Sequence, residues 1–220
     1  MYKNIVFDLG GVVVDFTPRE FLVDHFMNEK LENELYELTF GSKEWRMLDA
    51  GELTRHEATC TIMAKAAQTG RIFEAEGILA DWMDMLKTKD DTFALMNKLK
   101  RKGYNIYYLS NISQDVLELL QKRKFWPLFD GGIASYEVKM LKPDLRIYNA
   151  LLSKYKLNPE ETIFTDDNKI NASAAFDAQI TGIHFKNVRS FAKALDSYGV
   201  CLERKKRVPH PPKEEKHKKI

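Results

Sequence analysis

Short apolar runs alternate with helical patterns along most of the chain. The first run spans residues 4–7, and after Asp90 four more apolar runs alternate with amphipathic stretches. Strands separated by helices in this way are joined by right-handed crossovers and form a parallel sheet with helices on its faces. The pattern therefore predicts an α/β fold with a doubly wound, Rossmann-like parallel sheet. We expect strands at 4–7, 104–109, 132–135, 162–165 and 182–185, and helices between them at 91–102, 113–123, 143–155 and 170–179.

Between the first strand and Asp90 the pattern is helical, and no convincing strand is found. Two of the predicted helices begin with a capping box, Thr17 with Glu20 and Thr54 with Glu57. Such a box satisfies free amide groups at a helix start, so it marks where a helix begins. Four helices are expected in this part, at 17–38, 42–48, 54–70 and 73–86.

The patterning divides the chain into three parts. Residues 1–15 and 89–202 are predicted to form one discontinuous α/β domain, and residues 16–88 a small all-helical domain inserted into it. Residues 203–220 carry eight Lys or Arg and three Glu, a net charge of +5, which leaves −3 for residues 1–202. This proline-containing basic tail is expected to be flexible. A basic tail is suited to contacting nucleic acid or a membrane surface. Because this one has no interleaved aromatic residues for stacking on bases, we expect a solvated appendage and neither nucleic acid nor a membrane as its partner.

Composition narrows the class of protein. The chain has 220 residues, of which 44% are hydrophobic and 30% charged, and no apolar run is long enough to span a bilayer. Asp8 interrupts the apolar start, so we do not expect a signal peptide. Cys60 and Cys201 are far apart in sequence and are interpreted as free thiols. We therefore expect a cytoplasmic protein, whose oligomeric state the sequence leaves open.

Polar side chains follow three of the predicted strands. Asp8 ends the first strand, Ser110-Asn111 ends the second, and Asp166-Asp167 ends the strand at 162–165. The carboxyl ends of parallel strands meet at one edge of a sheet, where α/β proteins bind ligands. We expect these groups to form an oxygen-rich site suited to Mg²⁺ and phosphate.

Structural roles remain open for most of these residues. Asp8 is equally suited to capping a turn, and Asn111 or Ser113 to capping the next helix. Lys142 is suited to pairing with phosphate or an acidic nucleophile, although lysines before helices are common at surfaces. Asp166 and Asp167 are harder to explain in this way, because adjacent buried carboxylates repel each other unless a cation compensates them.

Four motifs resemble those of the haloacid dehalogenase (HAD) superfamily of hydrolases in order and spacing. They are Phe7-Asp8-Leu9-Gly10-Gly11-Val12, Ser110-Asn111, Lys142-Pro143, and Thr165-Asp166-Asp167-Asn168 followed by Asn171. The resemblance spans residues 1 to about 190, and the helical insertion resembles the small cap of subfamily I. The first and third motifs look most like the sugar-phosphatase branch that includes α-D-glucose-1-phosphate phosphatase.

This resemblance implies a Mg²⁺-dependent phosphatase acting on a small phosphorylated metabolite, such as a sugar phosphate. Asp8 would be the nucleophile and form an aspartyl-phosphate. Ser110 and the amide of Asn111 would bind the transferred phosphoryl group, and Lys142 would neutralise nucleophile and phosphate. The remaining roles implied are metal binding by Asp8, Asp167 and the carbonyl of Gly10, with Asp166 also at the metal and Asn171 supporting it.

Gly10 departs from the pattern of the superfamily. Most of its phosphatases carry a second Asp two residues after the nucleophile, which serves as general acid and base. Loss of such a group typically costs about 10²–10⁴-fold in rate. Asp15, near the predicted entrance of the site, is a hypothetical replacement.

Two alternatives to the phosphatase stay open. The absent acid suggests a weak or inactive phosphate-binding module, and the same nucleophile is used without metal in 2-haloacid dehalogenation. The paired Asp166 and Asp167 argue against dehalogenation, since that reaction needs no metal-binding carboxylates. A receiver-like signalling domain would lack the helical insertion.

Overall fold

The computed structural model describes residues 1–202, and the predicted basic tail at 203–220 lies outside this range. A five-stranded sheet with the order β3-β2-β1-β4-β5 is at its centre, and all neighbouring strands are parallel. The predicted α/β class is therefore confirmed, with each strand within one residue of its expected start. The strands are β1 Asn4–Phe7, β2 Asn105–Ser110, β3 Gly131–Ala134, β4 Thr162–Asp166 and β5 Thr181–His184.

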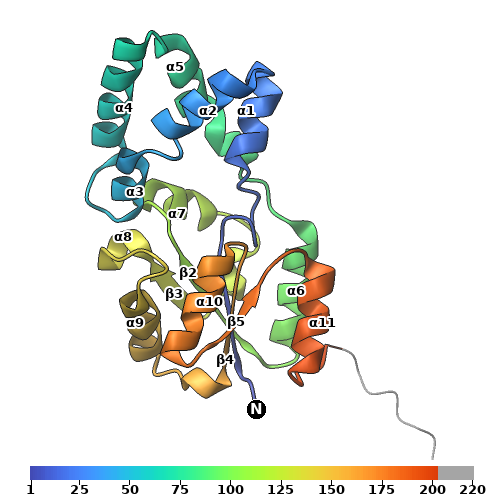
Figure 1. Cartoon of the computed structure of the whole chain (residues 1–220). Helices are drawn as coiled ribbons and strands as arrows, with labels where there is room; N and C mark the ends of the chain where they lie inside the picture. The colour runs from blue at the N-terminus through green and yellow to red at the C-terminus, as the bar shows by residue number, and fades with distance from the viewer. Residues whose placement is uncertain (203–220) are drawn as a thin grey trace, which may run out of the picture.

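Both faces of the sheet are buried, as the continuous apolar strands predict. Side chains alternate along a strand, so Val6 of β1 packs with Ile147 and Leu151 on one face. Its neighbours Ile5 and Phe7 join the larger core on the other face. The first face is covered by α9 (Leu145–Tyr155) and the second by α6 (Asp90–Arg101) and α11 (Val188–Ser197), which lie side by side in Figure 1.

Helices α1 to α5 lie together at the end of the sheet away from the N-terminus (Figure 1). Ser42 accepts a hydrogen bond from the Trp45 amide, and the capping box of Thr54 and Glu57 is complete, so two predicted helix starts are confirmed. These helices are α1 Pro18–Phe26, α2 Glu29–Leu38, α3 Lys43–Asp49, α4 Arg55–Thr69 and α5 Ile72–Asp81, followed by a 3₁₀ turn at Trp82–Met85.

The single helix predicted over 17–38 is wrong. Met27 has a left-handed backbone (φ 46°), and the Asn28 side chain accepts a hydrogen bond from the Leu31 amide to begin α2. Thr17 makes no capping hydrogen bond through its side chain. A local asparagine cap therefore outweighs the continuous helical pattern.

Other helices differ from prediction at their ends, and two were missed. The predicted helix at 170–179 is divided into α10 and a 3₁₀ turn, while α9 begins at Leu145 because Asp144 caps it. The missed helices are α11 and the short α8. The remaining elements are α7 Gln114–Leu120, α8 Ser135–Val138, α10 Lys169–Ala174, and 3₁₀ turns at Trp126–Leu128, Pro159–Glu161 and Ala175–Ala178.

Two chain segments connect the helices α1–α5 to the sheet, and they pair with each other. Val14 and Thr88 form an antiparallel bridge, and the Asp15 amide donates to the Lys87 carbonyl at 2.8 Å.

In the part of the chain that the structure describes, no helix is long and apolar enough to cross a membrane.

Candidate active site

Asp8 lies immediately after β1. The strands that carry the other predicted site residues end at the same edge of the sheet. The carboxylate of Asp8 is almost completely buried, and Oδ1 accepts a hydrogen bond from the Leu9 amide at 2.7 Å. The buried Ser110 at the end of β2 also hydrogen-bonds to it. The adjacent strands β1 and β2 thus bring the two residues together, as the sequence predicts.

Lys142 is buried at the same edge of the sheet, in contact with the carboxylates of Asp8 and Asp166. Its ammonium group contacts Asp8 Oδ2 at 2.9 Å, Asp166 Oδ2 at 2.5 Å and the Leu109 carbonyl at 2.9 Å. These three acceptors satisfy the three N–H groups of a charged lysine. The side chain is fully buried, so the alternative of a surface lysine is wrong.

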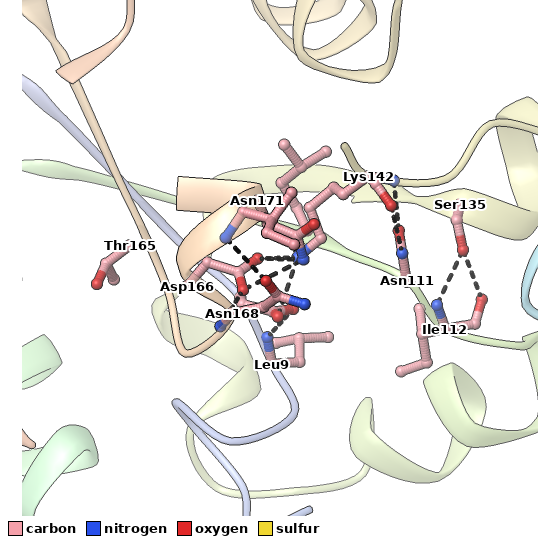
Figure 2. A network of polar contacts seen from close by, with 12 residues as sticks. Leu9, Asn111, Ile112, Ser135, Lys142, Thr165, Asp166, Asn168 and Asn171 are labelled. Carbon is pink, nitrogen blue, oxygen red and sulfur yellow. Dashed lines mark hydrogen bonds and ion pairs between the residues drawn. The ribbon is translucent and has the colours of Figure 1, made fainter. Parts of the chain in front are cut away.

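Asn111 holds the loop that carries Lys142 in place. Its Nδ2 donates to the Lys142 carbonyl at 3.0 Å, and its Oδ1 accepts from the Lys142 amide at 2.8 Å (Figure 2). The side chain of Asn111 is therefore committed to the loop. Ser113 caps no amide with its side chain and instead donates to Asp115.

Asp166 is fully buried at the end of β4 and is held from two sides. Figure 2 shows Lys142, Asp166 and Asn171 pointing toward one another, and Asn171 Nδ2 lies 3.2 Å from Asp166 Oδ2. Asp166 Oδ1 accepts from the Asn168 amide at 2.8 Å. Asn171 thus supports Asp166, in agreement with its predicted position.

Asp167 lies against the glycine turn that follows Asp8. A Cβ atom added to Gly11 would lie only 2.1 Å from Asp167 Oδ2, and Gly11 has φ +71°. One carboxylate oxygen from each of Asp8, Asp166 and Asp167 lies within 4.8 Å of the others. Hard oxygen ligands at this spacing fit Mg²⁺, so the residues present are suited to the metal predicted from the sequence.

The electrostatics of the cluster also favour a divalent cation. Burial raises the pKa of Asp8 to about 7, and Asp166 adds to the rise while Lys142 and Ser110 oppose it. Burial and the neighbouring Asp166 raise the pKa of Asp167. Burial lowers the pKa of Lys142, but Asp8 and Asp166 outweigh it and raise that pKa overall. Three carboxylates thus share one ammonium group, and their excess negative charge would stabilise a bound cation.

A cavity of about 60 Å³ adjoins this cluster. Gly10, Ser110 and Asn111 line it from the sheet side, and Asp49 and Trp82 line it from the helical side. Sequence reasoning missed Asp49, which belongs to none of the four motifs and carries no local signal of function.

Asp15 is placed differently from the other predicted residues. Its carboxylate pairs with Lys89 at 3.1 Å, and it lines a separate hollow with Thr17 and Glu20. The structure therefore does not bring Asp15 into the cavity beside Asp8.

The parallel sheet with carboxylates, a lysine and a serine at its carboxyl edge defines an α/β protein with a ligand site of the kind used by enzymes. Residues 2–179 match the family of haloacid dehalogenase-like hydrolases, so the chain belongs to this family. The family predicted from the four motifs is thus confirmed.

Similar proteins include phosphatases with different substrates. The sesquiterpene phosphatase astK of Aspergillus oryzae is 27% identical over 203 residues, which is 92% of this chain and 94% of that protein. The D-ribitol-5-phosphate phosphatase of Bacteroides thetaiotaomicron is 29% identical over 188 residues, or 78% and 85%. A HAD family enzyme of the same bacterium, solved with magnesium and inorganic phosphate, has a TM-score of 0.64 at 26% identity, with 84% and 95% covered. These similarities support phosphatase activity.

Proposed function

We propose that this protein is a Mg²⁺-dependent phosphomonoester hydrolase that acts through an aspartyl-phosphate on Asp8. The observation that carries the proposal is the position of Asp8, whose carboxylate contacts the Lys142 ammonium and lies within 4.8 Å of carboxylate oxygens of Asp166 and Asp167. The phosphatase relatives and the neighbour solved with magnesium and phosphate support it. The substrate is a small phosphorylated metabolite.

Each residue at the sheet edge has a role in this mechanism. Lys142 contacts Asp8 and favours its ionised form, which attacks phosphorus, whereas burial favours the neutral acid and raises the pKa of Asp8. The Ser110 hydroxyl and the backbone amide of Asn111 hold the phosphoryl oxygens as negative charge develops on them. Bond formation between Asp8 and phosphorus releases the alcohol, and water then hydrolyses the aspartyl-phosphate.

Asp8, Asp167 and the carbonyl of Gly10 would hold Mg²⁺, which supplies positive charge to the phosphoryl oxygens. Asp166 is within reach of the same ion, and its hydrogen bonds from Lys142 and Asn171 fix its orientation. We further propose that residues 16–88 are a cap domain over the site and that the protein is cytoplasmic.

Hydrolysis of p-nitrophenyl phosphate, with and without Mg²⁺, tests this function. The native protein should show Mg²⁺-dependent turnover, and Asp8→Asn should lose it because the amide cannot attack phosphorus. Asp177→Asn is the matched control, since this exposed carboxylate lies outside the site. Turnover that is no higher in the native protein than in Asp8→Asn would contradict the proposal.

Gly10 motivates a second candidate, a module that binds phosphate without turning over substrate. Inorganic phosphate binding in the presence of Mg²⁺, measured by calorimetry, would then occur without hydrolysis of any phosphomonoester tested.

A further inference from the structure

The cavity beside Asp8 is mostly apolar. Eight of its thirteen lining residues have apolar side chains, among them Phe16, Trp45, Trp82 and Val116. These side chains come from residues 16–88 and from α7, and they share the cavity with Gly10 and with Ser110, which hydrogen-bonds to Asp8.

The polar side chains of the cavity offer little to a sugar. The Ser113 hydroxyl donates to Asp115 and accepts from Arg55, and the Ser110 hydroxyl hydrogen-bonds to Asp8. The side-chain amide of Asn111 is bound to the loop of Lys142. Asp49 also lines the cavity, and its carboxylate forms no hydrogen bond or ion pair within residues 1–202. Buried hydroxyl groups without partners weaken binding, so a polyol is a poor occupant.

We propose that the substrate is a phosphomonoester of a small apolar alcohol, an inference that rests on the proposed phosphatase function. A cavity of about 60 Å³ has room for roughly two water-sized groups, since each occupies about 30 Å³, so it would hold the first carbons of the alcohol. These carbons would pack against the apolar side chains that make up most of the lining.

Pentyl phosphate and glycerol 3-phosphate provide the test, because their alcohols match in number of non-hydrogen atoms. We expect kcat/KM to be at least about tenfold higher for pentyl phosphate. Val116→Thr, which places a hydroxyl in the cavity, should reduce this preference. Val200→Thr should not, since Val200 is equally apolar and buried but lies outside the cavity.

Turnover of p-nitrophenyl phosphate separates the two possible failures. If the protein hydrolyses it but uses glycerol 3-phosphate as well as pentyl phosphate, the apolar substrate class is overturned and the phosphatase function stands. If Mg²⁺-dependent turnover is absent for all three esters, both proposals fall.

A second inference comes from the space around Gly10. A Cβ atom at this position would lie 3.3 Å from Phe16 Cβ, so the Phe16 side chain crowds the place where a general acid would begin. The alcohol still needs a proton, and the site must take it from another residue.

Asp49 enters the same cavity from the end of α3. Its carbonyl oxygen accepts a hydrogen bond from the buried Ser135 hydroxyl, which also accepts from the Ile112 amide. This chain of contacts anchors Asp49 to the loop of Ser110. Burial raises the pKa of Asp49 to about 7, with Arg55 opposing the rise and Asp115 adding to it.

We also infer that Asp49 donates the proton that position 10 does not supply. As Asp8 bonds to phosphorus, the bond to the ester oxygen breaks, and this oxygen takes the proton of Asp49 and leaves as the alcohol. The Asp49 carboxylate then takes a proton from water, whose oxygen attacks the aspartyl-phosphate. The bond between phosphorus and Asp8 breaks, and inorganic phosphate is released.

The leaving group distinguishes this role from a structural one. For Asp49→Asn, kcat/KM on pentyl phosphate should fall about 10²–10⁴-fold, because the alkoxide is a poor leaving group. On p-nitrophenyl phosphate, whose phenolate leaves without a proton, it should fall less than about threefold.

Asp24→Asn, at an exposed position of α1, is the control and should change neither value. Equal losses on both esters, or a leaving-group-dependent loss in Asp15→Asn instead, would overturn the role of Asp49.

Discussion

Lys142→Met removes the ammonium group that Asp8 and Asp166 share while preserving most of the side-chain volume. Lys142 is fully buried and contacts the two carboxylates at 2.9 and 2.5 Å. Breaking a buried ion pair by removing one partner typically costs about 3–5 kcal/mol, because the remaining charge is buried without compensation. Total stabilities are about 5–15 kcal/mol, so this loss would be a large fraction of the whole.

Urea unfolding at pH 7 in the presence of a chelator measures this effect. The free energy of unfolding should fall by about 3–5 kcal/mol in Lys142→Met. Part of this loss should return in the double variant Lys142→Met/Asp166→Asn, which removes one uncompensated charge. The loss should also be smaller at pH 5, where a protonated Asp8 no longer needs the cation.

Lys154→Met is the matched control. Lys154 is half-exposed and lies 3.7 Å from Glu137, so its removal should cost less than about 1 kcal/mol. Equal losses for Lys142→Met and Lys154→Met would refute the reasoning, as would strict additivity of the double variant.

Three further variants or conditions test the site. Gly11→Ala should abolish Mg²⁺-dependent turnover in the p-nitrophenyl phosphate assay, because its Cβ would collide with Asp167 and φ is +71°. Mg²⁺ affinity, measured by calorimetry, should weaken about tenfold per pH unit below 7, since the pKa of Asp8 is raised to about 7 and the metal binds its ionised form. In Asp8→Asn this slope should become shallower, and the dependence that remains comes from Asp167, whose pKa is also raised. Arg55→Ala should lower the free energy of unfolding by about 1–2 kcal/mol in urea, because its bonds to Asp115 are lost.

Much of the sheet and its edge was predictable because those features are local. Apolar runs bounded by helical patterns located the five strands, and parallel pairing placed Asp8, Ser110 and Asp166 at one edge. The break at Asn28 was also a local signal, but the continuous helical pattern concealed it. Helix α11 was missed, although it completes the face that α6 covers.

The amino-acid sequence by itself determined the five strands, most of the helices, the family and the residues at the strand ends. Only the tertiary structure decided that Lys142 is buried between two carboxylates and that Asp15 pairs with Lys89 outside the cavity. It also brought Asp49 to the site, through a contact with Ser135 that is remote in sequence. Periodicity records which face of an element is buried, but the position of a helix over the sheet depends on long-range packing that no local pattern contains.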